Sequence, residues 1–535
     1  MKYLSLSKEI KNLAQKNIFQ SLIGFFRKNF LFFTVFVTGA GVLVIEVVAM
    51  RVLAPYYGNT IFTASSVITV ILAALSIGYY LGGRFSDKNP SSDWFFKIVF
   101  LSGFFLLLFY LFGVIILPLL SFIFSIILGP LISSLVLFFF PALLLGTLSP
   151  YAIKLQSIYF PEQGVGTIAG KVFFWSTLGS IVGSLSAGFV LIPNFGIRQI
   201  IITTGVALFF LGFLPLIKIG SDKKKLHKIF IAFFVIIAGI IIAEYQTDKN
   251  IVYIKDGVYE KITIRDGEYK NRPVRFFQQD HSMSGGMFLD SDDPADLVFD
   301  YTKYYLFYKI FTPSVKDILV VGGGAYSIPK AMLQELPLAA IDVSEIEPSL
   351  FNLAKKYFKA ADNPRLHNYT EDGRRLLAFS DKKYDMIFSD VYFSLYSVPV
   401  HFTTQEFFKI VKEKLNEDGI LVINIIGDLS QDNQSLIMSE IKTIQTVFNN
   451  SYFFAVKSPE AAGAQNIIIV GYNSDKRIDF NSSSVANHQD PFIRDLKNKI
   501  ISVDKFDLSS QLVLTDNFSP VEYLTAKVLS RKFGN

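Results

Sequence analysis

An apolar stretch that ends in three glycines is the segment of this sequence best suited to chemistry. Asp317 to Val321 leads directly into Gly322, Gly323 and Gly324. A strand that breaks into glycines lets the backbone approach a ligand closely. About twenty residues later, Glu345 follows the next predicted strand, where a carboxylate can bind both hydroxyls of a ribose.

Glu347 is a second candidate for that role, although a solvated helix start before Pro348 is the favoured interpretation. Asp372, after a third strand, is placed to accept a hydrogen bond from an adenine amine. Asp390 ends a fourth strand, where its carboxylate would point into the cleft. The spacing of these acids predicts a nucleoside-binding, Rossmann-like fold.

Further polar and aromatic residues are expected around the same cleft. His281 and Asp390 would form an acid/base pair, with Tyr301 as a third catalytic candidate; a surface hairpin position is the alternative for His281. Loop packing is the alternative for the aromatic candidates. The candidate substrate-binding residues are Gln278, Gln279, Tyr304, Tyr392, Tyr396, His401, Asp516 and Glu522. No metal site is expected, because the chain has no cysteine and its five histidines are scattered.

Alternating strands and helices must position these residues. Short alternating stretches at 251–254 and 259–264 predict β-hairpins. Beyond them, strands are predicted at 317–321, 339–343, 386–390 and 419–425, and helices near 328–335, 348–358 and 404–415. This order predicts a doubly wound sheet with its ligand beyond the strand C-termini.

The first half of the chain is too apolar for an ordinary soluble domain. The 535 residues are 51% hydrophobic and only 18% charged. About seven stretches have roughly the length that crosses a bilayer: 30–54, 61–82, 95–117, 131–148, 167–192, 196–217 and 229–243. The expected organisation is a basic segment (1–28), a transmembrane helical domain (29–245), a β-hairpin region (246–312) and a Rossmann-like catalytic domain (313–535).

Basic residues collect beside three of these stretches and predict the topology. They are Lys8, Lys11, Lys16, Arg27 and Lys28; Arg84 and Lys88; and Lys218, Lys223, Lys224, Lys225 and Lys228. The positive-inside rule places all three groups in the cytoplasm. If 229–243 spans the membrane, the C-terminal domain lies on the extracytoplasmic face.

The order of these motifs resembles the spermidine synthases, the polyamine aminopropyltransferases. The resemblance is carried by Gly322-Gly323-Gly324, Ser344-Glu345-Ile346-Glu347, Glu371-Asp372-Gly373-Arg374 and Phe388-Ser389-Asp390. The membrane half looks like that of the membrane-fused branch, through Gly39, Glu46, Arg51, Pro55, Gly58 and Gly82-Gly83-Arg84. The resemblance implies decarboxylated S-adenosylmethionine, or a related adenosyl compound, in the cleft. It also implies Glu345 on ribose, Asp372 on adenine and Asp390 as the base that deprotonates the attacking amine.

Two positions depart from that family's pattern. Ala325 stands where the soluble enzymes carry an acid that holds the aminopropyl ammonium, and Phe393 replaces a second aspartate. These departures and the predicted topology motivate an alternative: a cofactor-independent lyase or transferase of the same fold that acts outside the cytoplasm on a glycan, lipid headgroup or surface polymer. A transporter with a C-terminal sensor domain is a third hypothesis.

The expected partners are a lipid bilayer and a small-molecule or glycan acceptor. A homodimer is left open. Nucleic acid is not expected, because the net charge of +6 is modest and the basic residues lie beside apolar segments rather than in one stripe.

Overall fold

The computed structural model describes residues 2–217, 228, 231–240, 249–391, 398–429 and 435–533, with side chains from residue 30 to residue 528. The chain divides into two compact units. The first comprises Met1–Leu53, Phe62–Phe122 and Leu128–Gln246, and the second comprises Ala54–Ile61, Ile123–Ile127 and Thr247–Asn535.

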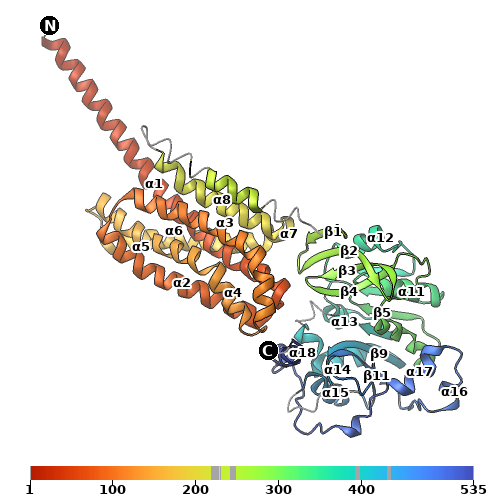
Figure 1. Ribbon diagram of the computed structural model, residues 1–535. Helices are drawn as coiled ribbons and strands as arrows, with labels where there is room; N and C mark the ends of the chain where they lie inside the picture. The colour runs from red at the N-terminus through yellow and green to blue at the C-terminus, as the bar shows by residue number, and fades with distance from the viewer. Residues whose placement is uncertain are drawn as a thin grey trace. The chain divides into compact units, whose positions relative to one another are not determined.

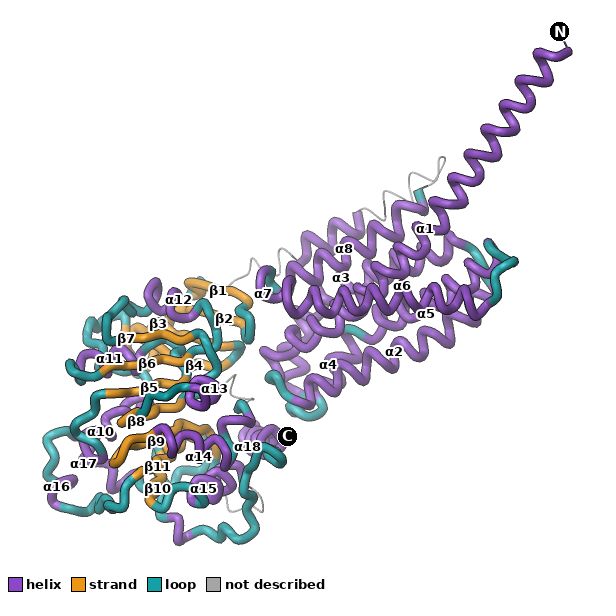
Figure 2. The backbone as a smooth tube through the Cα atoms, turned by 180° about the vertical axis from the view of Figure 1, so that it is seen from behind, coloured by secondary structure: helices purple, strands orange, loops and turns teal. Residues whose placement is uncertain are grey.

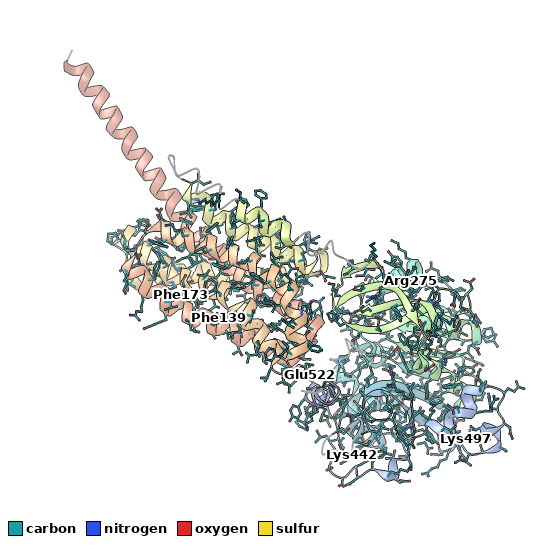
Figure 3. All side chains as sticks on the ribbon, viewed as in Figure 1. Phe139, Phe173, Arg275, Lys442, Lys497 and Glu522 are labelled. Carbon is teal, nitrogen blue, oxygen red and sulfur yellow. The ribbon has the colours of Figure 1, made fainter. Side chains whose placement is uncertain are left out.

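The first unit is a bundle of apolar helices (Figure 1). They are α1 (Lys2–Tyr57), α2 (Ile61–Lys88), α3 (Ser92–Ile123), α4 (Gly129–Leu137), α5 (Phe139–Tyr159), α6 (Val165–Ser186), η1 (Ala187–Leu191), α7 (Ile192–Asn194), α8 (Ile197–Phe213) and η2 (Leu214–Leu216). Large apolar side chains remain exposed on this unit (Figure 3); Phe173, for example, is 54% exposed. An exposed apolar surface of this kind suits contact with lipid.

Five segments are long and apolar enough to cross a membrane: Phe30–Tyr57, Ile61–Lys88, Ser92–Ile123, Val165–Asn194 and Ile197–Leu216. A sixth span is possible if α4 and α5, which meet at a bend of 55°, count as one. The seventh predicted span, 229–243, lies partly outside the described residues; its described part is the short helix Ile231–Ile240. The number seven therefore stays a prediction, and so does the topology, because residues 218–227 also lie outside the described part.

Small residues bring α1 and α6 into close contact. A Cβ atom added to Gly179 would lie 2.0 Å from the carbonyl oxygen of Phe36, and one added to Gly183 would lie 2.4 Å from that of Ala40. The Ser180 hydroxyl donates to the Gly39 carbonyl at 3.1 Å. Small residues at four-residue spacing on α6 therefore let the two helix backbones approach closely.

The second unit begins with a four-stranded antiparallel sheet, in the order β1-β2-β3-β4. Its strands are β1 (Ile251–Asp256), β2 (Lys261–Tyr269), β3 (Arg272–Gln279) and β4 (Ser282–Phe288). The β3–β4 turn has Asp280 at φ 51°, in the left-handed region. This sheet confirms the predicted hairpin region.

A seven-stranded sheet follows, in the order β10-β11-β9-β8-β5-β6-β7 (Figure 2). Its strands are β5 (Asp317–Val321), β6 (Ala340–Ser344), β7 (Leu366–Tyr369), β8 (Tyr384–Ser389), β9 (Leu415–Gly427), β10 (Asn450–Ala455) and β11 (Gln465–Asn473). Strands β5 to β9 pair in parallel, whereas β11 is antiparallel to β9 and β10. The predicted Rossmann-like fold is confirmed, and the antiparallel pair β10–β11 is an addition that the sequence did not indicate.

The helices of this unit are η3 (Asp300–Phe307), α10 (Tyr308–Phe311), α11 (Ser327–Glu335), α12 (Leu350–Tyr357), α13 (Gly373–Phe379), η4 (Val400–Phe402), α14 (Gln405–Lys414), α15 (Leu436–Gln445), α16 (Ser483–Ala486), α17 (Pro491–Lys499), η5 (Val503–Lys505) and α18 (Val521–Phe533). Two buried apolar clusters cover the two faces of the sheet. Alternate residues of β5 belong to different clusters: Val320 to one and Leu319 to the other. Burial on both faces explains why its parallel strands are almost continuously apolar.

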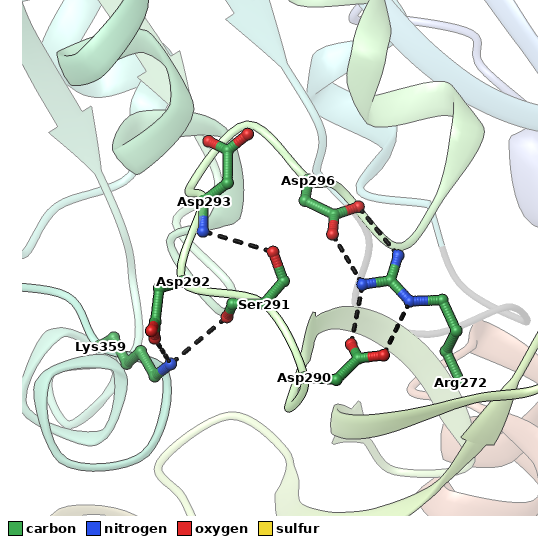
Figure 4. A network of polar contacts seen from close by, with 7 residues as sticks. All are labelled: Arg272, Asp290, Ser291, Asp292, Asp293, Asp296 and Lys359. Carbon is green, nitrogen blue, oxygen red and sulfur yellow. Dashed lines mark hydrogen bonds and ion pairs between the residues drawn. The ribbon is translucent and has the colours of Figure 1, made fainter.

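An ion-pair network anchors the loop after β4 (Figure 4). Arg272 pairs with Asp290 and Asp296, each through an Nη2 contact of 2.8 Å. Lys359 pairs with Asp292 and also donates to the Ser291 carbonyl at 3.3 Å. The loop is thereby tied to β3 and to the segment that follows α12.

Candidate functional site

A cavity of about 450 Å³ opens in the second unit beyond the carboxyl ends of β5, β6 and β8. This size lies within the usual range for small-molecule sites. The predicted residues that line it are Gln279, His281, Tyr301, Gly322, Gly323, Gly324, Glu345, Asp372, Asp390 and His401. The strand ends thus bring most of the candidate residues together.

Glycine is required at the turn after β5. Gly322 has φ +94°, and a Cβ atom there would lie 2.4 Å from the Asp390 carbonyl oxygen. Gly324 also has a positive φ, of +50°. Any side chain at position 322 would therefore displace Asp390 from the strand end.

Asp390 is held by two hydrogen-bond donors. The Asn424 Nδ2 atom donates to its Oδ1 at 2.8 Å, and the Tyr301 hydroxyl, which also lies 3.4 Å from the Ser284 carbonyl oxygen, contacts its carboxylate. The Asn466 Nδ2 atom donates to the side-chain Oδ1 of Asn424 at 2.9 Å and so turns the Asn424 Nδ2 atom toward Asp390. Burial raises the pKa of Asp390, although both hydrogen bonds oppose that shift. A carboxylate with a raised pKa is a stronger base than an exposed one.

Glu345 clamps the glycine turn. Its Oε2 accepts hydrogen bonds from the Gly323 and Gly324 amides at 2.8 and 3.3 Å, and its Oε1 accepts one from the Glu347 amide at 2.9 Å. Burial raises the pKa of Glu345, and these backbone bonds oppose the shift. Its carboxylate fixes the turn and also lines the cavity, so its predicted contact with a ribose stays a prediction.

Glu347 does not occupy the solvated helix start that the sequence favoured. It is 3% exposed. Its Oε2 accepts from the Val258 amide at 2.7 Å and its Oε1 from the Ser349 hydroxyl at 2.9 Å. The side chain ties the β1–β2 turn to the Rossmann-like sheet, a contact between distant segments that no local pattern indicates.

Asp372 and His401 form a pair at the start of α13. Asp372 Oδ1 accepts from the Arg375 amide and Oδ2 pairs with His401 Nε2, both at 2.9 Å. Burial acts to raise the pKa of Asp372, but these hydrogen bonds outweigh it and hold the pKa below its ordinary value. Asp372 therefore presents an ionised carboxylate at this end of the cavity.

His281 lines the cavity at the β3–β4 turn. Its ring centroid lies 5.1 Å from that of Tyr56, and both residues belong to the second unit. Desolvation lowers the pKa of His281, with a further contribution from Lys261. The hydrogen bonds of Asp390 go to Asn424 and Tyr301, so the predicted pair between His281 and Asp390 does not form here.

Four predicted residues lie away from the cavity lining. Tyr304 is 2% exposed in the core, where its ring packs edge-to-face on Phe492 at 4.9 Å. Gln278 is adjacent to Gln279 in β3 and so points to the other face of the strand, donating to the Asp280 carbonyl at 2.9 Å. These two placements correct the sequence-based predictions.

The other two belong to the C-terminal segment. Asp516 accepts a bidentate pair of hydrogen bonds from Arg374: Nη1 donates to Oδ1 at 2.8 Å and Nη2 to Oδ2 at 2.6 Å. Glu522, at the start of α18, accepts from the Ile61 amide at 2.7 Å. Both carboxylates make contacts between segments far apart in sequence and do not line the cavity, so their contact with a substrate stays a prediction. Tyr392 and Tyr396 lie outside the described residues, as does Phe393.

Several cavity residues were missed. Asn424 interrupts the apolar run from Ile420 to Ile426 in β9, and that interruption was a usable signal. Asn466 lies in β11 and Lys457 in the segment between β10 and β11, a strand pair that was not predicted. Glu260 and Ser284 come from the hairpin region and carry no local signature.

The lining is strongly acidic. Its described residues include one lysine, Lys457, and the carboxylates Glu260, Asp300, Glu345, Glu371, Asp372 and Asp390. Such a cavity concentrates cations. Among the described residues, no group of three or more histidine, aspartate or glutamate side chains is arranged to hold a metal ion.

Comparison with known proteins finds similarity in sequence and in structure. Residues 307–482 match the spermine/spermidine synthase domain. The chain is 28% identical over 243 residues to a polyamine aminopropyltransferase from Vibrio vulnificus, covering 43% of this chain and 78% of that relative. It is 25% identical to a probable polyamine aminopropyl transferase from Bifidobacterium longum, covering 52% of this chain and 63% of that relative. The crystal structure of a probable spermidine synthase from Corynebacterium glutamicum aligns with a TM-score of 0.38 and 21% identity, covering 44% of this chain and 84% of that one.

Proposed function

We propose, from the premise that residues 307–482 form a spermine/spermidine synthase domain, that this protein is a membrane-bound aminopropyltransferase. It would move an aminopropyl group from decarboxylated S-adenosylmethionine, or a related adenosyl sulfonium, to an amine. The observation that carries the proposal is the position of Asp390: a buried carboxylate with a raised pKa, held by Tyr301 and Asn424 beside the glycine turn.

The residues of the cavity suit the donor. The glycine turn gives backbone access, Glu345 and Asp372 present acceptors for ribose and adenine, and the surplus of carboxylates favours a sulfonium cation. The donor supplies a carbon made electrophilic by the positive sulfur.

Asp390 acts as the general base in this reaction. An ammonium ion cannot attack until it loses a proton, which Asp390 accepts. The nitrogen forms a bond to the aminopropyl carbon while the carbon–sulfur bond breaks, and the sulfonium leaves as the neutral thioether methylthioadenosine. Tyr301 and Asn424 keep the carboxylate oriented during the transfer.

Calorimetric titration with decarboxylated S-adenosylmethionine, S-adenosylmethionine and methylthioadenosine tests the proposal. We expect tight binding of the decarboxylated form. Asp390→Asn is expected to bind it nearly normally but to lose release of methylthioadenosine, whereas the exposed acid Asp381 gives a matched control in Asp381→Asn. Absence of nucleoside binding would reject the proposal and favour cofactor-independent chemistry.

We further propose that the apolar helices hold the chain in a bilayer. Their length and their exposed apolar side chains support this role. The basic flanks favour an extracytoplasmic C-terminal domain, although the donor is made inside cells. A reporter fused after Asn535 decides the orientation: activity of a periplasmic reporter supports the outside placement, and activity of a cytoplasmic reporter overturns it.

A further inference from the structure

Three cavity carboxylates have no role in the mechanism above. Asp300 and Glu371 form ion pairs with basic side chains, which leaves Glu260. Glu260 immediately precedes β2, lines the cavity and is 4% exposed. Its Oε1 accepts a hydrogen bond from Gln279, whereas its Oε2 is buried and has no hydrogen-bond partner among the described residues. A buried acceptor without a partner is costly, so a ligand group that donates to it would be favoured.

The charges around Glu260 indicate which type of hydrogen-bond donor suits it. Among the described residues, three acidic groups act on it: Asp280, Glu345 and Glu347. Burial raises the pKa of Glu260 well above its usual range; the Gln279 hydrogen bond opposes this shift and the three acids add to it. A neutral hydroxyl would satisfy the hydrogen bond but would not stabilise the ionised form of Glu260 among these acids. A cationic donor satisfies both requirements.

We propose that Glu260 receives a primary ammonium group of the ligand and thereby determines specificity for amine-bearing substrates. This inference rests on the proposed function. The ammonium could belong to the aminopropyl chain of the donor or to the acceptor amine, and the two sources share the same chemistry at Oε2.

The test uses the full chain, with Glu260→Gln as the variant. This change removes the charge but keeps the shape of the side chain and its contact with Gln279. Glu268 lies in β2, the strand that Glu260 precedes, and is exposed, so Glu268→Gln is the matched control. Thermal unfolding establishes that each variant is folded. If Glu260→Gln does not fold, Glu260→Asp replaces it, because this variant keeps the carboxylate but moves it away from the ligand.

Three calorimetric titrations separate the possibilities. The probes are decarboxylated S-adenosylmethionine, the same sulfonium nucleoside with a propyl chain that lacks the amine, and 1,4-diaminobutane added to protein saturated with methylthioadenosine. If the donor ammonium meets Glu260, the variant binds the first probe about tenfold or more weakly and the second unchanged. If the acceptor ammonium does, only the diamine loses affinity.

The inference is overturned if the variant binds all three probes as wild type does. It is also overturned if the propyl nucleoside loses as much affinity as the aminopropyl nucleoside, because Glu260 would then recognise the nucleoside or support the fold. If the wild-type protein binds neither nucleoside, the proposed function fails. The diamine without nucleoside then decides the inference: loss of its binding in Glu260→Gln supports it, and no binding to wild type rejects it.

Discussion

The hydrogen bond from Asn424 to Asp390 offers a quantitative test of the proposed base. Asn424→Leu removes the 2.8 Å bond while filling a similar volume in β9. That bond favours the charged form of Asp390, so its loss raises the pKa further above the ordinary value. A hydrogen bond to a charged group contributes about 1.5 to 3 kcal/mol, and about 1.4 kcal/mol corresponds to one pKa unit. The expected rise is therefore about one to two units.

The pH dependence of methylthioadenosine release reports this change. Because only ionised Asp390 accepts the proton, we expect the acid limb of kcat/KM to move to higher pH by about one to two units. Below that limb the variant should be about ten- to a hundredfold slower than wild type, whereas the two should converge at higher pH. The measurement compares both proteins across the same buffers, with thermal unfolding as a check on folding.

Asn466→Leu is the control, because it removes the contact that orients the Asn424 amide but keeps the donor itself. Its acid limb should shift by less than half as much. An acid limb that stays in place in a folded Asn424→Leu protein, or that moves to lower pH, would refute the role of Asp390 as the base.

Two further predictions concern stability. Gly179→Leu should lower the unfolding midpoint in detergent, with a cost of about 1 to 3 kcal/mol or more, because a Cβ atom there meets the Phe36 carbonyl at 2.0 Å. Gly170→Leu in the same helix, with nothing within 4 Å, should change it little, and equal losses would contradict the packing account. Glu440 is buried in α15, its Oε1 has no hydrogen-bond partner among the described residues, and burial raises its pKa well above the usual range. Its stabilising contribution is therefore complete below the unfolded-state pKa and is lost as the pH rises through the folded-state pKa. Glu440→Leu should then raise the unfolding midpoint more at pH 8 than at pH 5, and a pH-independent effect would contradict this.

Local patterns determined much of the architecture. Long apolar stretches, the glycine turn and alternating strands and helices are encoded within short windows, so the helical unit, the four-stranded sheet and the parallel strands were predictable. The same holds for Asp390, Glu345 and Asp372, because the topology of a doubly wound sheet carries strand ends to one edge. Counting spans was harder, since the apolar sequence hardly stops between α3 and α5.

Tertiary structure decided which side chains share the cavity. Tyr304 lies only three residues from Tyr301 and has the same side chain, but packing places it in the core. Asp516 was a substrate-binding candidate, but it pairs with Arg374. Glu260 joined the site only because the hairpin sheet brings the start of β2 to the cavity. Sequence alone determined which residues end the strands, because that depends on local periodicity. Their partners depend on contacts between segments far apart in the chain, which only the folded structure brings together.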